Sequence, residues 1–447
     1  MRSPSAVPSA RKPIAALLCG LAIGLSPAAW GQSLKELYEA ARAYDATYLA
    51  AKALFDSAEY RVAQTEALAR PSAALSSSAT LTRLDLPIPR GGEGSSNSAG
   101  ATVNGRYPLI NRANEATIAQ SRKSLVVSQA DLESAEQDLI VRVAQAYFDV
   151  LASQDSLATQ RANKTAITEQ LASAKRNFEV GTATITDTRE VQARFDLATA
   201  TEIAAENDLR TKRVALDQLV GRASVVPKQL LVPVNLPPVL PADPEVWVTA
   251  ADQQHPTIRR ARVGLEVAQL ETAKARAGEK FTLDAVGSVG ATYANGSLAG
   301  TPGTSKNASV GVQFNLPLYT GGATQNRIKE TLVLEEKSRN DLEAARRGVT
   351  QATRVTFLSV QSLLAQVKAL EAAEASSKLA LEATQLGYRV GVRVNLDVLN
   401  AQRDLFQTQR DLAKARYDVL LNGLRLRQAA GGLSPSDIDA VNVLLAK

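Results

Sequence analysis

The chain has few of the residues on which catalytic and metal sites depend. Its 447 residues include one cysteine and one histidine. A single cysteine excludes an intrachain disulfide and a cysteine-rich metal site. A single histidine excludes histidine-rich zinc binding and argues against Ser-His-Asp catalysis. The sequence also has no Gly-x-Ser-x-Gly elbow and no phosphate-binding loop. We therefore expect no enzyme activity, no catalytic residue, no cofactor and no metal.

Aromatic residues are also scarce, at 4% of the chain, with two tryptophans and one methionine. Large globular cores use such residues to fill volume, whereas this chain is rich in Ala, Leu, Val, Gln, Arg and Glu, which favours long helices. The formal net charge of +6 includes three basic residues in the first twelve positions. We expect a mildly basic surface that binds no nucleic acid.

Residues 1–31 have the pattern of a secretory signal peptide. Basic residues at the start precede an apolar run from Ile14 to Leu25, and Ala29-Trp30-Gly31 offers a cleavage site. Cys19 lies inside the apolar run and follows two leucines, whereas a lipoprotein signal requires a small residue before the cysteine. We expect a mature N-terminus at Gln32 without a lipid anchor.

An internal repeat organises the rest of the chain. Residues 34–221 and 244–431 correspond at an offset of about 210, so that Val180-Gly181 recurs as Val390-Gly391 and Asp187 recurs as Asp397. We divide the mature chain into a first repeat (32–221), a Pro-rich linker (222–243), a second repeat (244–431) and a C-terminal tail (432–447).

Each repeat predicts a helix, two strands, a very long helix, a break and a shorter helix. The first helix is expected over about 33–70, and the strands over 72–84 and 99–109, with copies at 281–293 and 308–318. Alternating polarity over about ten residues, between polar loops, is typical of membrane-spanning β-strands. A pair of soluble hairpins is the alternative interpretation of these strands.

Residues 111–179 contain neither proline nor glycine and predict a helix of about 100 Å. Leu125, Leu132, Leu139 and Ala146 recur every seven residues, as in a coiled-coil seam. The helices after the breaks carry a second seven-residue track, represented by Leu209 and Leu216 in the first repeat and by Leu405, Leu412, Val419 and Leu426 in the second. Such rods must pack lengthwise against one another.

Four strands per chain cannot close a barrel, and an open edge in lipid leaves backbone groups unpaired at a cost of several kcal/mol each. Three chains supply twelve strands, which are sufficient for a pore. The predicted fold class is therefore mixed. It comprises a trimeric twelve-stranded transmembrane β-barrel, with four strands per protomer, continuous with a long α-helical coiled-coil barrel, and each chain contains an internal duplication.

Three motifs resemble the TolC family of outer-membrane efflux and secretion channels. They are Asn315-Leu316-Pro317-Leu318-Tyr319-Thr320-Gly321-Gly322 at a strand-to-helix junction, Phe178–Gly181 with Ile185–Asp187 at the first helix break, and Gly387–Arg393 with Asp397–Leu399 at the second. The resemblance covers essentially the whole mature chain. It implies a homotrimer in outer-membrane lipid, a periplasmic helical tunnel, and a mixed band at mid-length containing residues 227–243 and 433–447.

The resemblance also implies roles for residues at the periplasmic tip. Asp187, Tyr388 and Arg393 are expected to link neighbouring coiled coils and hold the tip closed. The alternative for the two charged residues is that they are solvated helix-end charges. The turns at Val180, Gly181, Val390 and Gly391 are expected to form the docking surface for a periplasmic adaptor, although each glycine also acts as a helix stop.

Cation selectivity is expected to depend on Asp397, repeated threefold at the lumen constriction. The family pattern has a second aspartate three residues further on, but this sequence has Asn400 there, which predicts weaker selectivity unless Asp404 compensates.

The resemblance implies the function of an outer-membrane exit duct of a tripartite export system. The duct would extend into the periplasm and, with an adaptor and an ABC-type or RND-type inner-membrane transporter, pass small molecules, type I secreted proteins or both. The sequence leaves the cargo and the transporter open. A periplasmic coiled-coil structural or adaptor protein without a pore is the alternative, but it gives the four strands no role.

Overall fold

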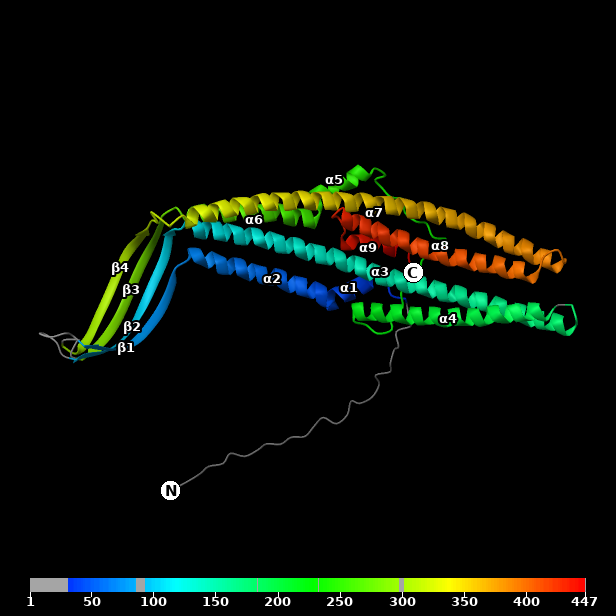
Figure 1. Ribbon diagram of the computed structural model, residues 1–447, viewed down its shortest axis with the longest axis horizontal. Helices are drawn as coiled ribbons and strands as arrows, with labels where there is room; N and C mark the ends of the chain where they lie inside the picture. Colours follow the sequence, from blue (N-terminus) through cyan, green and yellow to red (C-terminus); the bar gives the residue numbers. More distant parts are fainter. Residues whose placement is uncertain (1–30, 86–92, 183, 232, 297–300, 447) are drawn as a thin grey trace, which may run out of the picture.

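The computed structural model describes residues 31–85, 93–182, 184–231, 233–296 and 301–446. The molecule is elongated, with a β-sheet at one end and long helices running away from it (Figure 1). The predicted signal peptide lies outside the described residues except for Gly31. No helix in the described part of the chain has both the length and the hydropathy that crossing a membrane requires.

The two halves contain the same elements in the same order, as the repeat predicted. The first half comprises α1 (Leu34–Tyr44), α2 (Ala46–Glu66), β1 (Ser72–Asp85), β2 (Glu93–Ile110), α3 (Arg112–Glu179) and α4 (Ile185–Val220), with a short 3-10 turn (Ala67–Ala69) after α2. The second half comprises α5 (Pro244–Gln254), α6 (Pro256–Ala277), β3 (Thr282–Asn295), β4 (Gly303–Asn315), α7 (Ala323–Arg389) and α8 (Asn395–Ala429). A final helix, α9 (Pro435–Asn442), follows.

The prediction of one continuous helix over about 33–70 is wrong, because the chain breaks between α1 and α2. Asp45 has an extended backbone, and its carboxylate accepts a hydrogen bond from the Tyr48 amide at 2.8 Å, which caps α2. The break recurs 210 residues later at His255. There Pro256 disfavours helical backbone at the preceding residue, and His255 Nδ1 accepts from the Thr257 amide at 3.1 Å.

The four strands form one antiparallel sheet in the order β1-β2-β3-β4. β2 and β4 begin at Glu93 and Gly303, earlier than the expected positions 99 and 308. The Ser/Gly-rich start of β2 was expected to be a turn, but it pairs with the end of β1, for example Ser98 with Thr80. Backbone pairing therefore starts these strands earlier than the alternating sequence pattern does. β4 ends at Asn315, two residues before Pro317, which has no backbone amide to donate to a neighbouring strand.

The two longest helices, α3 and α7, contain 68 and 67 residues and are each about 100 Å long. α3 packs along α4, and α7 packs along α8 (Figure 1). The predicted seams are buried or partly buried. Leu139 and Leu216 are fully buried, Leu412, Val419 and Leu426 are at most 3% exposed, and Leu132 and Ala146 pack against the core.

The largest cluster of buried residues lies where α1, α4, α8 and α9 meet α3, near mid-length of the molecule (Figure 1). The linker and the tail join it. Gln32 forms a bridge with Pro227, and Leu230 forms one with Leu445. The hydroxyl of Tyr147, on α3, lies 2.8 Å from the Lys228 carbonyl and 3.2 Å from the Gln32 carbonyl. One buried tyrosine thus contacts both Gln32, the predicted start of the mature chain, and the Pro-rich linker.

Candidate functional site

The two faces of the sheet differ in polarity. Residues directly opposite in neighbouring strands share a face, so the register Leu75–Val103–Val289 defines one of them. This face carries apolar and aromatic side chains from all four strands: Leu75, Val103, Tyr107, Leu283, Val289, Tyr293, Val310, Val312 and Phe314. Several are strongly exposed, including Val310 at 96% and Leu75 at 72%. An exposed apolar face of this extent is typical of a lipid-facing sheet.

The opposite face of the sheet is polar. The Asn104 amide donates to the Ser76 hydroxyl at 3.2 Å, and the Ser288 and Ser309 hydroxyls lie 2.8 Å apart. The charged side chains of this face, among its described residues, are Arg106 and Asp284, whose Nη2 and Oδ2 atoms are 2.7 Å apart. The apolar face and the polar face together give the sheet the character of a wall between lipid and an aqueous lumen.

Both edges of the sheet lack a partner strand among the described residues. β1 has 14 residues and β4 has 13, and each pairs on one side. Unpaired backbone donors and acceptors along such edges require another strand if the sheet lies in lipid. The sheet is therefore incomplete in a single chain.

At the far end of the molecule the helices turn back in two matching turns (Figure 1). Gly181 and Gly391 have φ values of 79° and 81°. The amides of Gly181 and Thr182 donate to the carbonyls of Phe178 and Asn177. The corresponding bonds at the second turn run from Gly391 and Val392 to Tyr388 and Gly387. This double hydrogen-bond pattern is the Schellman motif, which requires a residue that tolerates positive φ.

The predicted docking residues at these turns are exposed and apolar. Val180 is 73% exposed and Val390 65%, and the adjacent Val392, which was not among the predicted residues, is 76% exposed. A Cβ atom added at Gly181 or Gly391 would meet nothing within 4 Å, so the glycines serve the backbone conformation and leave the surface open. The tip therefore presents apolar side chains from both repeats.

Asp187 caps a helix in this structure. Its carboxylate accepts from the Thr184 amide at 3.0 Å and from the Thr184 hydroxyl at 2.8 Å, while that hydroxyl accepts from the Asp187 amide. These hydrogen bonds, the backbone one first, hold the pKa of Asp187 below its usual value. The carboxylate remains ionised and partly exposed at the start of α4.

Asp397, the copy of Asp187, has a different partner. The residue at its helix N-cap is Val394, which has no side-chain hydrogen-bond acceptor for a capping box. The Asp397 carboxylate lies 3.5 Å from Arg393 Nη1 in an exposed ion pair. Tyr388, 38% exposed, lies just before the turn. The structure thus brings two predicted residues, Arg393 and Asp397, together within one chain.

Asn400 and Asp404 also have partners in the chain. Asn400 Oδ1 accepts from Arg194 Nη2 at 3.2 Å, which joins α8 to α4. The Asp404 carboxylate accepts two hydrogen bonds from the adjacent Arg403, at 2.9 and 3.1 Å. Sequence reasoning did not single out Arg194. The repeat offers the only signal for it, because Arg194 aligns with Asp404 at the offset of 210.

Comparison with known proteins places these features in a family. The model of the family described as "Outer membrane efflux protein" matches the chain twice, at residues 37–222 and 247–432. Outer membrane protein TolC of Vibrio cholerae is 33% identical over 438 residues, covering 96% of this chain and 98% of that protein. The alkaline protease secretion protein AprF of Pseudomonas aeruginosa is 32% identical over 349 residues, covering 76% and 71%.

Solved structures share the fold. The outer membrane channel CmeC of Campylobacter jejuni matches with a TM-score of 0.78 at 17% identity, covering 92% of this chain and 90% of that one. The outer membrane protein VceC of Vibrio cholerae matches with a TM-score of 0.76 at 20% identity, covering 89% and 96%. With a family model that matches both repeats and a relative that aligns over nearly its full length, the chain belongs to the outer membrane efflux protein family.

Proposed function

We propose that this chain is the exit duct of a tripartite export system, which passes small molecules, type I secreted proteins or both to the exterior. It lies in the outer membrane and extends into the periplasm, as its family does. The observation that carries the proposal is the sheet, which has one exposed apolar face, one polar face and two unpaired edges. Relatives whose names refer both to efflux and to protease secretion leave both kinds of cargo open.

The duct is proposed to be a homotrimer. β4 of one copy pairs with β1 of the next, so that three four-stranded sheets close a twelve-stranded barrel and satisfy every edge. The polar faces then line the lumen, and the apolar faces contact lipid.

The tip is proposed to dock a periplasmic adaptor, which links the duct to an ABC-type or RND-type transporter of the inner membrane. Two exposed Val-Gly turns per chain, repeated threefold, give a ring of apolar sites. Asp187, Tyr388 and Arg393 are proposed to link neighbouring coils in the closed tip, and Asp397 to line the constriction. Tyr388 and Arg393 are exposed in a single chain, and Asp187 and Asp397 are partly exposed, so all four are accessible to neighbouring copies.

Membrane fractionation and conductance separate this duct from a poreless periplasmic coiled-coil protein. The duct is expected in the outer-membrane fraction, with a gel mobility that changes on heating, and purified protein is expected to open ion-conducting channels in a planar bilayer. Recovery in the soluble periplasmic fraction, without conductance, would support the coiled-coil alternative.

A further inference from the structure

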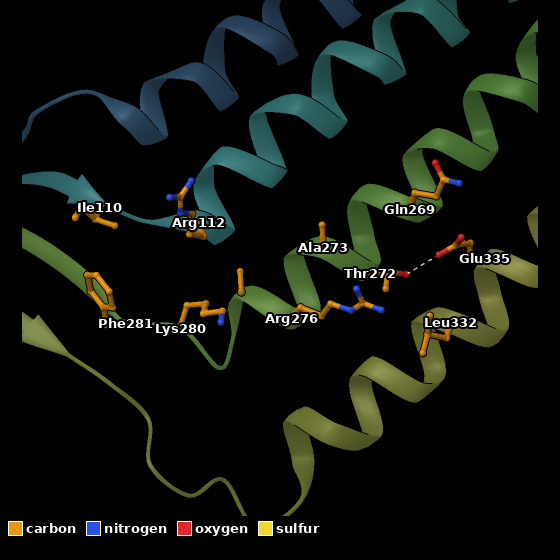
Figure 2. Close-up of a pocket in the computed structure, with 11 residues that line it drawn as sticks. Ile110, Arg112, Gln269, Thr272, Ala273, Arg276, Lys280, Phe281, Leu332 and Glu335 are labelled. Atoms are coloured by element: carbon orange, nitrogen blue, oxygen red, sulfur yellow. Dashed lines mark hydrogen bonds between the residues drawn. The ribbon is translucent and has the colours of Figure 1, made fainter.

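A pocket of about 840 Å³ opens where the sheet meets the helices (Figure 2). Its walls come from the end of β2 and start of α3, from α6, from the segment between α6 and β3, and from α7. Ile110, Phe281 and Leu332 are its large apolar residues, while Arg276, Lys280 and Glu335 are among its charged ones. Neither β1 nor the outer edge of β4 contributes to the lining, so strand pairing with a neighbouring copy does not cover it.

The pocket is continuous with the apolar face of the sheet. Ile110 lies directly opposite Leu283, which belongs to that face. Phe281 stacks on Phe314 of the same face, with ring centroids 5.4 Å apart. A molecule that lies against the lipid-facing side of the sheet therefore reaches the pocket without entering the lumen.

Two basic residues of the pocket have no ion-pair partner in the described part of the chain. Arg276 and Lys280 are exposed, and neither has an ion pair or side-chain hydrogen bond among the described residues. The other two charged residues of the lining have partners. Arg112 pairs with Glu115 at 3.0 Å, and the Glu335 carboxylate accepts from the Thr272 hydroxyl at 3.4 Å and lies 3.9 Å from Arg339 Nη2. Glu279, next to Lys280 in the chain, does not line the pocket.

Cations at the end of α6 also interact favourably with the helix dipole. That effect accounts for their position on the helix but not for the open volume or the aromatic wall beside them. The other repeat also has a cation at this level. Arg70 precedes β1 by two residues, as Lys280 precedes β3. Each chain thus carries basic residues at both junctions where the chain enters the sheet.

The length of the apolar face along the strands is close to the thickness of the apolar band in outer-membrane barrels, with the pocket at one end of it. Lys306 lies on the same face, opposite Ala291, and Tyr293 is the one apolar side chain named above that lies beyond it. Eight residue steps separate Lys306 from Phe314, which is about 26 Å along a strand. The apolar band of outer-membrane barrels is about 25 Å tall. A bilayer centred on this band would place Arg276 and Lys280 at the level of the lipid headgroups.

We infer that this pocket binds the phosphodiester headgroup of an anionic phospholipid in the periplasmic leaflet of the outer membrane. Arg276 and Lys280 contact the phosphate, and the acyl chains lie along the apolar face beyond Phe281 and Phe314. The inference rests on the proposed membrane-spanning barrel, because only that placement brings lipid to the pocket. Basic residues close to an anionic membrane surface attract its lipids in this way.

Native mass spectrometry of the protein in detergent tests the site. With added dioleoyl-phosphatidylglycerol and dioleoyl-phosphatidylcholine, the wild type is expected to retain the anionic lipid preferentially. Arg276→Gln or Lys280→Gln is expected to weaken phosphatidylglycerol binding by about fivefold, and the double variant by about thirtyfold. Phosphatidylcholine binding is expected to change little, because its headgroup has no net charge.

Two further variants make the result specific. The charge-conserving pair Arg276→Lys and Lys280→Arg is expected to retain the preference. Lys368→Gln with Lys378→Gln removes the same charge from exposed positions of α7 near its tip end and is expected to have no effect. Equal phosphatidylglycerol binding by wild type and the glutamine double variant, in protein that still forms conducting channels, would overturn the lipid site while leaving the duct itself intact.

Discussion

At the residue scale, equivalent positions of the two repeats have diverged in what they contact. Asp187 forms a capping box with Thr184, whereas its copy Asp397 follows Val394 and pairs with Arg393. A single change, from a hydroxyl side chain to an apolar one at the helix N-cap, frees the second carboxylate for an ion pair. The proposed selectivity of the constriction therefore depends on the balance between Asp397 and its neighbouring arginine.

Opposite substitutions in this ion pair should change ion selectivity in opposite directions. Asp397→Asn removes three carboxylates from the proposed constriction and is expected to abolish most of the cation preference. Arg393→Gln removes the neutralising charge and is expected to increase that preference. Reversal potentials across a salt gradient measure both. An unchanged preference in Asp397→Asn would show that another charge selects, with Asp404 the next residue to replace.

Arg194 should limit the effect that an acidic residue at position 400 has on cation selectivity. Its guanidinium already donates to Asn400, so an aspartate there would form an ion pair with it. We expect Asn400→Asp alone to raise the cation preference only slightly, and Asn400→Asp with Arg194→Gln to raise it more. Arg194→Gln alone is the matched control. If the single variant Asn400→Asp equals the double variant in reversal potential, Arg194 does not neutralise this position.

At the scale of elements, the polar contacts that join the first coiled coil to the second include one made by a partly buried carboxylate. The Tyr417 hydroxyl of α8 donates to Asp155 of α3 at 2.6 Å, next to the stacked rings of Phe148 and Tyr417. Burial raises the pKa of Asp155, and the hydrogen bond from Tyr417 partly opposes that rise. Burial therefore disfavours the ionised form of Asp155, and the hydrogen bond from Tyr417 offsets part of that free-energy cost.

Removing the donor and removing the charge should therefore have opposite effects on stability. Tyr417→Phe leaves a partly buried carboxylate without its donor and is expected to lower the free energy of unfolding by about 1–3 kcal/mol. Asp155→Asn is expected to be at least as stable as the wild type at pH 7. Because the folded-state pKa is raised, the ionisation penalty is present at neutral pH and disappears as the pH falls towards the unfolded-state value. The advantage of Asp155→Asn should shrink in the same range.

Thermal unfolding at pH 7 and pH 5 measures both variants. Tyr60→Phe, at a tyrosine that is 78% exposed, is the matched control and is expected to leave the midpoint unchanged. A loss of stability in Asp155→Asn at pH 7 as large as that in Tyr417→Phe would contradict the assignment.

The sequence predicted the elements whose signals are periodic. The stretch 111–179, which has neither proline nor glycine, predicted α3, and the 210-residue offset predicted its copy α7. The break at Asp45 was missed, although Pro256 marks the same break in the second repeat. The Gly/Ser-rich starts of β2 and β4 were missed because backbone pairing, and not side-chain polarity, makes them strands. Arg194 was missed because its contact with Asn400 joins residues 206 apart.

At the scale of the whole molecule, the sheet and the tip are related to neighbouring copies in different ways. The sheet needs strand partners along both edges if it lies in lipid. The tip offers two exposed Val-Gly turns in each copy. A threefold-symmetric arrangement of three chains accounts for both features, because it pairs the edge strands into a closed barrel and places the Val-Gly turns in a ring.

The stoichiometry of the purified protein in detergent tests this account most directly, because a twelve-stranded barrel with four strands per chain requires three chains. Native mass spectrometry is expected to give a mass three times that of the mature chain, and crosslinking is expected to stop at the trimer. A stable monomer or dimer as the sole species, in protein extracted from the outer membrane, would contradict the closed twelve-stranded barrel.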